Sequence, residues 1–332
     1  MVKRDNARPD IKRIITTALL AFGLAFGSSP GHAADYPEKT VRIVVGFAAG
    51  GATDALARMV AKSLNEAWGQ PVVVENRPGA GGNIAHEWVA RAAGDGYTLL
   101  FTSAPLAINP SLYANLGYDT LKDFKPITLV ATVPSLLLVP SASSIQSFGD
   151  FLAYTRGNPA KLSYGSAGNG TPQHLAMELL KSMARLHIVH VPYKGGAPAV
   201  ADLIGGQTDV MFAAFPEAAP HLNGGRLRAL AISSPTRSKL LPATPTVAEG
   251  GVAGFEAIGW QGLLAPGTTP PDLVKKIHDA TVAALSLPEN RARIDAMGIA
   301  FSGEGPAGFQ AFLGREVPKW AKVVKESGAK ID

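Results

Sequence analysis

The sequence predicts an α/β protein of two lobes whose sheets are largely parallel. Apolar, β-branched runs alternate with helical periodicity along almost the whole 332-residue chain, which is typical of consecutive βα units. The chain is also longer than the roughly 250 residues that a single hydrophobic core usually organises. Two glycine-rich segments, 41–60 and 162–180, each follow an apolar run and open a helical pattern. One such loop in each half of the chain suggests that the two loops close on one ligand from opposite sides.

The first 34 residues have the pattern of a secretory signal. Five Lys or Arg residues fall between Lys3 and Arg13, and an uncharged, largely apolar stretch covers 14–26. A membrane anchor is the alternative, but these thirteen residues fall short of the about 20 that span a bilayer. We therefore expect cleavage near Ala33 or Ala34 and export to the periplasm.

Composition excludes several classes of function. Without residues 1–34 the chain loses five of its 31 Lys and Arg and two of its 26 Asp and Glu, so its formal charge falls from +5 to +2. A nearly balanced charge with no basic run does not provide the basic surface that nucleic-acid binding requires. The absence of cysteine excludes disulfides, cysteine nucleophiles and thiolate metal ligands. No other apolar window reaches membrane length, so we expect a soluble product.

The first half of the chain predicts a series of βα units. A strand at 41–45 precedes a helix whose start is marked by Thr53 and Asp54. Residues 72–85 predict a strand, a turn and a further helix, and 97–102 predict another strand. The positions that predict one apolar face on the first helix are Leu56, Met59, Val60 and Leu64.

A second series of units follows. It predicts a helix at 148–154, a strand at 162–164 and a helix after Thr171, with Thr171 as N-cap and Pro172 in the first helical position. Further strands and helices are predicted over 187–234. The predicted apolar stripe of the helix after Thr171 consists of Leu175, Leu179 and Met183.

Two extended, proline-punctuated segments, 129–143 and 259–277, are the candidate crossovers between the lobes, and we expect them to form the hinge. The stretch 271–331 is mostly helical and lacks a large core of its own, so we expect it to pack on the first lobe. The first domain would then be discontinuous. The predicted domains are 35–135 together with 256–332, and 136–255.

Both glycine-rich loops have the properties of an anion cradle. Glycine lets the backbone approach a ligand without a Cβ in the way, and free N–H groups at a helix start point at a negative group. In the first loop, Thr53 would cap the helix or donate its hydroxyl to a carboxylate. Asp54 would repel an anion, so we interpret it as support for its own helix start through the helix dipole. Phe47 is a candidate for the wall of the site or for the core.

The second loop offers short polar groups at Ser166, Asn169 and Thr171, between glycines. His174 would contact a ligand or form an internal hydrogen bond, and Lys194 is either a cation beside the site or a solvated lysine. Open α/β sheets place ligands at strand ends. This rule adds Ser103, Ala104, Ala213, Ala214 and Phe215 as candidates.

Cofactor and enzyme motifs are incomplete. Ile84 and Gln173 stand where the two GxGxxG candidates need their last glycine, and no GK[ST] phosphate loop occurs. Tyr164 stands where a GxSxG elbow needs its first glycine. His187 and His190 point to opposite faces of a predicted strand and cannot easily share a metal. We therefore predict no catalytic residue, no cofactor and no metal.

With two lobes, two crossovers and a glycine-rich loop in each lobe, the sequence resembles the Bug-type periplasmic solute-binding receptors of tripartite tricarboxylate transporters. The resemblance covers nearly the whole chain after the leader. It implies a type II, Venus-flytrap binding fold with a ligand cleft between the lobes, no catalysis, and capture of a small carboxylate-bearing solute. The segments that carry it are VGFAAGGATD (45–54), VVVENRPGAGGNIA (72–85), DGYTLLFTS (95–103), YGSAGNGTPQHLAMEL (164–179), HVPYKGGAPAVADLIGGQTDVMF (190–212), LRALAISSPTRSKLLPATPTVAEGG (227–251) and WQGLLAPGTTP (260–270).

The resemblance also implies delivery of a small organic acid to the membrane subunits of a transporter, and we expect the receptor to be a monomer. A solute sensor for a membrane kinase is one alternative, and an exported serine hydrolase that uses Ser166 with His174 is another. The candidate ligand-binding residues are Phe47, Ala49, Gly50, Gly51, Ala52, Thr53, Ser103, Ala104, Ser166, Gly168, Asn169, Gly170, Thr171, His174, Lys194, Ala214 and Phe215, with Asp54 as structural support.

Overall fold

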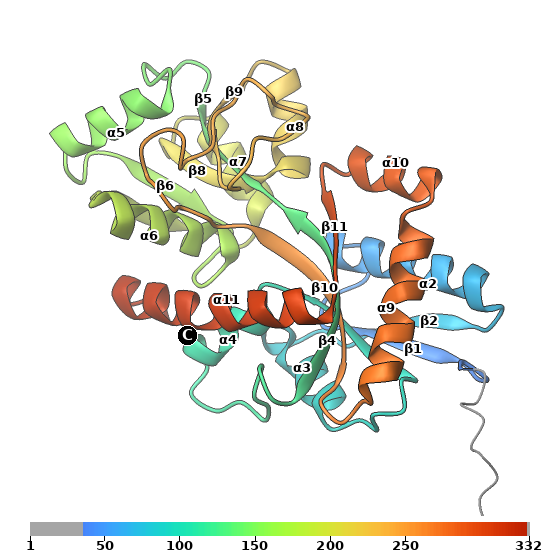
Figure 1. Ribbon diagram of the computed structural model, residues 1–332. Coiled ribbons are helices and arrows are strands. Elements are labelled where there is room, and N and C mark those ends of the chain that lie inside the picture. The colour runs from blue at the N-terminus through green and yellow to red at the C-terminus, as the bar shows by residue number, and fades with distance from the viewer. Residues whose placement is uncertain (1–35, 331–332) are drawn as a thin grey trace, which may run out of the picture. The chain divides into compact units, whose positions relative to one another are not determined.

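The computed structural model describes residues 36–330, and from Lys39 onward the chain forms one compact unit. The predicted leader, residues 1–34, lies outside the described residues. Within 36–330, no helix combines the length and the apolar content that crossing a bilayer requires. Two mixed sheets with their helices make up the unit (Figure 1).

The first sheet has six strands in the order β11-β4-β10-β3-β1-β2. β1 is parallel to β2 and β3, whereas β10 runs antiparallel to β3 and β4, and β11 runs antiparallel to β4. β1 is buried except at Arg42, which explains its nearly continuous apolar sequence. The strands are β1 (Val41–Val45), β2 (Val72–Asn76), β3 (Thr98–Ser103), β4 (Phe124–Val133), β10 (Gly259–Pro266) and β11 (Ala300–Glu304).

The first helix shows both a confirmed and a wrong prediction. Its apolar face is buried at Leu56, Val60 and Leu64, as predicted. The helix has Gly51 as its N-cap and no capping side chain, so the predicted cap at Thr53 is wrong. The helices that pack with the first sheet are α2 (Ala52–Trp68), α3 (Asn83–Ala90) after the short 3₁₀ turn η1 (Ala80–Gly82), α4 (Pro105–Leu112), α9 (Pro271–Leu285), α10 (Pro288–Ala296) and α11 (Pro306–Ser327).

The C-terminal segment packs on the first sheet, as predicted. α9 contacts α2 and β4, and α11 contacts α4 and β4. The ring of Trp260 on β10 meets Phe309 and Phe312 edge-on, with centroids 5.6 and 5.9 Å apart, and these contacts hold α11 against the sheet. The segment also supplies the edge strand β11, which was not predicted.

The second sheet has five strands in the order β7-β6-β8-β5-β9, and β5 is antiparallel to both of its neighbours. Thr171 caps α6 and Pro172 occupies its first position, as predicted. Met183 is 39% exposed, so its place in the apolar stripe of α6 is wrong. The elements are β5 (Ser135–Pro140), α5 (Phe148–Gly157), β6 (Ser163–Ser166), α6 (Pro172–Ala184), β7 (Val189–Pro192), α7 (Gly196–Ile204), β8 (Val210–Ala214), α8 (Phe215–Asn223) and β9 (Leu227–Ile232).

The chain crosses between the sheets twice. β4 leads almost directly into β5, as predicted for 129–143. The return crossing lies at 257–259, because the Ala257 amide still donates to Ser233 O beside β9, whereas Gly259 already pairs with Val133 on β4. The predicted second crossover, 259–277, begins at this crossing, but most of it is wrong, since it runs on through β10 and into α9. Neither crossing contains a helix of the kind that joins parallel strands. Accordingly, β5 and β10, the strands that follow the crossings, both run antiparallel to their neighbours. The sheets are therefore mixed, not largely parallel; the domain boundaries stay a prediction.

Candidate functional site

The predicted ligand residues lie at the carboxyl ends of parallel strands in both sheets. In the first sheet the loop 46–53 follows β1, and Ser103 ends β3. In the second sheet the loop 166–171 begins at the end of β6, Lys194 follows β7, and Ala214 ends β8. Because parallel strands end at the same edge, each sheet brings its own candidates together.

The loop 46–53, which includes the first two residues of α2, is largely exposed. Residues 48–52 are exposed, whereas Phe47 and Thr53 are half-buried. Gly50 has a φ of +88°, in the left-handed region that favours glycine. A Cβ on Gly46 would lie 2.9 Å from Gly82 Cα, so residue 46 has to be glycine for these two loops to pack.

Asp54 is buried and accepts its hydrogen bonds from protein groups. Its Oδ2 accepts from the Gly50 amide and from Arg58 Nε, both at 2.9 Å, and its Oδ1 accepts from Asn76 Nδ2 at 2.9 Å. Burial alone would raise the pKa of this carboxyl, but the hydrogen bonds outweigh burial and hold the pKa at about 2. The carboxylate is therefore ionised and tied to the loop that precedes its helix.

A third loop, 77–83, packs against the loop 46–53 at Gly82, and sequence reasoning did not include it among the candidates. Asn109 Nδ2 donates to Gly81 O at 3.1 Å and to Asn83 Oδ1 at 2.7 Å, and Tyr118 Oη donates to Asn83 Oδ1 at 2.7 Å. Asn76, which ends β2, donates to Phe47 O at 3.0 Å and so links this region to the first loop. The run of glycines after β2 was the available signal.

A buried histidine lies beneath this third loop. His86 is fully buried, with Nε2 at 2.8 Å from Thr102 Oγ1 and Nδ1 at 3.1 Å from Tyr118 Oη. Burial lowers the pKa of His86 to about 3. The ring is therefore neutral at physiological pH and serves as an internal hydrogen-bonding partner.

The loop 166–171 is held by its own hydrogen bonds. Gly168 O accepts from Thr171 Oγ1 at 2.7 Å and from Ser166 Oγ at 3.2 Å. The Gly170 amide donates to His174 Nδ1 at 3.0 Å. Asn169 is exposed at the tip, whereas Ser166 is fully buried.

The hydrolase alternative required Ser166 to pair with His174, and this pairing is wrong. Ser166 Oγ instead lies 2.7 Å from His190 Nε2. The acid near His174 is Glu178, 4.0 Å away, and its Oε1 accepts a hydrogen bond from Lys181. Ser166 is fully buried, so an external ester cannot reach its hydroxyl.

The remaining candidates differ in exposure. Lys194 is exposed, Ser103 and Ala214 are half-buried, and Ala104 is only 3% exposed, within the core. The ring of Phe215 lies directly against Gly298, in the turn before β11.

Two glycine contacts show that the segments of the two sheets meet. Gly298, which touches Phe215, belongs to the segment that supplies the first sheet's edge strand. Gly170 lies so close to Leu112 of α4 that an added Cβ would be 2.8 Å from Leu112 Cδ1. Two candidate residues of the second sheet, Gly170 and Phe215, therefore contact segments that pack with the first sheet.

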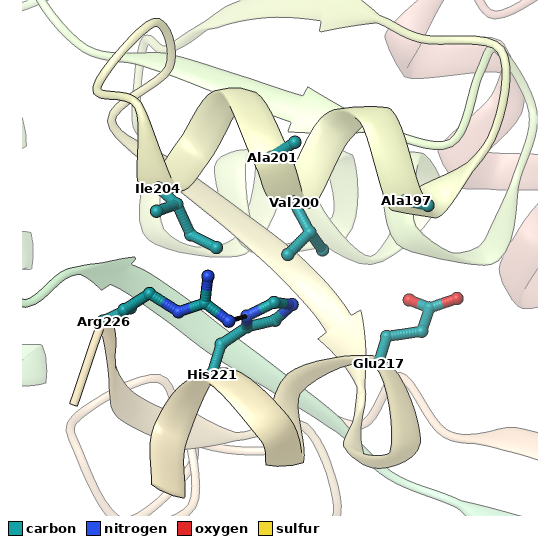
Figure 2. Close-up of a pocket in the computed structure, with 7 residues that line it drawn as sticks. All are labelled: Ala197, Val200, Ala201, Ile204, Glu217, His221 and Arg226. Atoms are coloured by element: carbon teal, nitrogen blue, oxygen red, sulfur yellow. Dashed lines mark hydrogen bonds between the residues drawn. The ribbon is translucent and has the colours of Figure 1, made fainter. Parts of the chain in front are cut away.

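A groove on the second sheet's helices is separate from all of these residues. Figure 2 shows α7 and α8 facing each other across it. Its volume is about 490 Å³, and Arg226 donates a hydrogen bond of 2.6 Å to His221 Nδ1 on one side. None of the candidate ligand residues lines this groove. Its lining residues are Ala197, Val200, Ala201, Ile204, Glu217, His221 and Arg226.

Two α/β lobes, each with a glycine-rich loop at the carboxyl ends of its parallel strands, define a solute-binding protein. In residues 36–330, no three His, Asp or Glu side chains are arranged to hold a metal ion. The model of the tripartite tricarboxylate transporter family receptor matches residues 56–329. The chain belongs to this family of periplasmic solute-binding receptors, which are not enzymes, and the predicted resemblance is confirmed.

Individual relatives agree with this assignment. The chain is 35% identical to protein BugT of Bordetella pertussis over 331 residues, which cover 97% of this chain and 99% of BugT. It is similar to the structure of R. palustris Rpa4515 with adipate, at 36% identity and a TM-score of 0.75, covering 89% of this chain and 100% of that one. It is also similar to MatC from Rhodopseudomonas palustris with bound malate, at 32% identity and a TM-score of 0.71, covering 87% and 100%.

Proposed function

We propose that the protein captures a small carboxylate-bearing solute between the loops 46–53 and 166–171. The observation that carries this proposal is the start of α2, where residues 48–52 are exposed and no side chain caps the helix. Helix-start N–H groups favour an anion, and the nearby acid, Asp54, is buried and occupied by protein donors.

Two relatives support carboxylates as the ligand class. Adipate and malate, found with Rpa4515 and MatC, are both dicarboxylates. We propose that the first loop fixes one carboxylate group, whereas Asn169, Thr171 and the strand ends near Ser103 and Ala214 contact the rest of the ligand. Binding would favour a closed state in which the second lobe swings onto the first.

We further propose that the leader is cleaved near Ala33 or Ala34 and that the receptor delivers its ligand to the membrane subunits of a tripartite tricarboxylate transporter. Family membership supports this role. The test is genetic: genes for two membrane subunits are expected beside this one, and deleting any of the three is expected to abolish uptake of the same acid. Normal uptake after deletion of the receptor would contradict the proposal.

Ligand binding is tested by a thermal-shift screen of monocarboxylates, dicarboxylates, aromatic acids and amino acids. A ligand at 100 times its Kd stabilises the native state by about 2.7 kcal/mol. If no carboxylate raises the melting temperature, the proposed function is wrong.

The place of the carboxylate is tested by a matched pair of variants at the N-cap of α2. Gly51 has φ −78° and ψ 168°, which any residue adopts, and an added Cβ would meet only Ala48 O at 3.7 Å. Asp and Asn are equally good N-caps, so Gly51→Asp and Gly51→Asn should both fold stably. Only Gly51→Asp places a negative charge at the site, and it should weaken carboxylate binding at least about tenfold more than Gly51→Asn. Equal affinities of the two variants would remove the first loop from the site.

A further inference from the structure

Two histidines hold the loop 166–171 from below. His190 Nε2 lies 2.7 Å from Ser166 Oγ at the start of the loop, and His174 Nδ1 accepts the Gly170 amide at 3.0 Å near its end. The two rings are stacked, with centroids 4.1 Å apart and planes inclined by 5°. Tyr164 stacks on His190 at 4.6 Å. The loop thus rests on an aromatic stack with one hydrogen bond near each end.

The Gly170 bond determines which nitrogen of His174 carries the proton. A backbone N–H can donate only to an unprotonated nitrogen, so Nδ1 is the acceptor and the proton is on Nε2. Nε2 lies 4.0 Å from Glu178 Oε1. Protonating the ring would place an N–H on Nδ1 opposite the Gly170 N–H, and this hydrogen bond would be lost.

Few charges nearby would compensate a protonated ring. Glu178 accepts hydrogen bonds from both Lys181 Nζ and Tyr164 Oη, so its charge is already balanced. Lys330 shares the adjoining cavity of about 360 Å³ with both histidines, and it adds further positive charge. His174 is 4% exposed, so water solvates it poorly. Protonation of His174 in the held loop is therefore unfavourable.

We infer that His174, stacked on His190, is a positioning residue that holds the loop 166–171 ready for ligand only while its ring is neutral, so that acidification releases the loop. The inference rests on the proposed function, since it assigns a regulation to the same site. His174 acts through the Gly170 amide and does not itself touch the ligand.

The direction of the pH effect follows from the lowered pKa of both histidines. Burial, then the neighbouring His174 and Lys181, lowers the pKa of His190 to about 4, and burial lowers the pKa of His174. In a released loop both rings would regain the ordinary value near 6.5. The held loop is therefore fully favoured above about pH 6.5 and loses its advantage as the pH falls toward 4. For His190 alone, acidification to pH 5 shifts the balance toward the released loop by up to about 30-fold.

A pair of variants at His174 separates its acceptor from its titration. The amide oxygen of Asn occupies nearly the position of Nδ1, so His174→Asn keeps an acceptor for Gly170 that cannot be protonated, whereas His174→Leu removes the acceptor. The ligand-free measurement is the hydrogen-exchange protection of the Gly170 amide. Wild type should lose protection between pH 6.5 and 5, His174→Asn should lose less of it because only His190 still titrates, and His174→Leu should lack it throughout. His187→Asn, at an exposed histidine, is the control and should follow wild type.

Binding gives a second measurement, with adipate and malate as probes. The ionisation of the acid itself cancels when the variant is compared with wild type at each pH. His174→Asn and wild type should have similar affinity at pH 7.5, and His174→Asn should bind more tightly than wild type at pH 5, because its acceptor for the Gly170 amide cannot be protonated. If neither acid binds any of the proteins, adipate and malate are not ligands of this receptor, and the exchange measurement still decides the inference.

The inference is overturned if Gly170 protection in wild type does not change between pH 7.5 and 5, or if His174→Asn shows the same pH profile as wild type. Should a variant not fold, an NMR titration of the histidine Cε1–H signals of the wild-type protein decides instead. A His174 that titrates near 6.5 in the folded protein would overturn the inference.

Discussion

Replacing Asp54 by Asn is expected to lower the free energy of unfolding by about 2 kcal/mol at pH 7. The carboxylate accepts hydrogen bonds from Gly50, Arg58 and Asn76, and its pKa is held at about 2 instead of 3.8. One pKa unit corresponds to about 1.4 kcal/mol, which gives this magnitude. An asparagine side chain has one acceptor oxygen, so it cannot satisfy the same three donors.

The dependence on pH makes this prediction specific. Because the pKa is lowered in the folded protein, the stabilisation is present above pH 3.8 and is lost as the pH falls through 2. Urea unfolding followed by circular dichroism should show the difference between wild type and Asp54→Asn falling below about 1 kcal/mol by pH 2.5. The control is Asp272→Asn, an exposed acid in the first turn of α9, which should cost only a few tenths of a kcal/mol, on the order of 0.3. A difference at pH 7 no larger than this control would refute the assigned role of Asp54.

Two further substitutions test the loops. Gly46→Ala should destabilise the protein by about 1–3 kcal/mol in chemical denaturation, because the new Cβ would clash with the Gly82 backbone, whereas Gly51→Ala should be nearly neutral. Equal costs would disprove the close approach. Thr171→Val removes the hydroxyl that caps α6 and bonds Gly168 O, so it should cost about 1 kcal/mol of stability and weaken binding of the acid identified by the screen, measured by calorimetry. Unchanged affinity would exclude Thr171 from the site.

The fold was predictable where local periodicity and tertiary packing agree. β1 is a fully apolar run except at Arg42, and α6 begins with a clear N-cap followed by proline, so both were located correctly. The second crossover was misplaced because 259–266 is an apolar strand followed by proline-rich turns, and nothing local shows which sheet it joins. β11 alternates exposed and half-buried residues at a sheet edge and carries little apolar signal.

The loops of the candidate site were predictable from the sequence, but the contacts within them were not. Glycine patterns located the segments after β1 and β6, because backbone conformation there demands glycine at positions such as Gly50 and Gly170. The partner of Ser166 was not predictable, since His190 lies on a neighbouring strand, 24 residues away in the sequence. The pairing of two distant strands is a property of the sheet, and spacing along the chain does not encode it.

The end of α11 has a practical consequence for work with this receptor. Residues Ser327 to Lys330 border the same cavity as Asn169, His174 and His190, at the far end of a helix that also contacts α6. A fluorophore attached at Lys330 would therefore lie beside the loop 166–171 and would report movement of this loop. Because the label shares the cavity with His174 and His190, affinities of labelled protein should be compared with those of unlabelled protein.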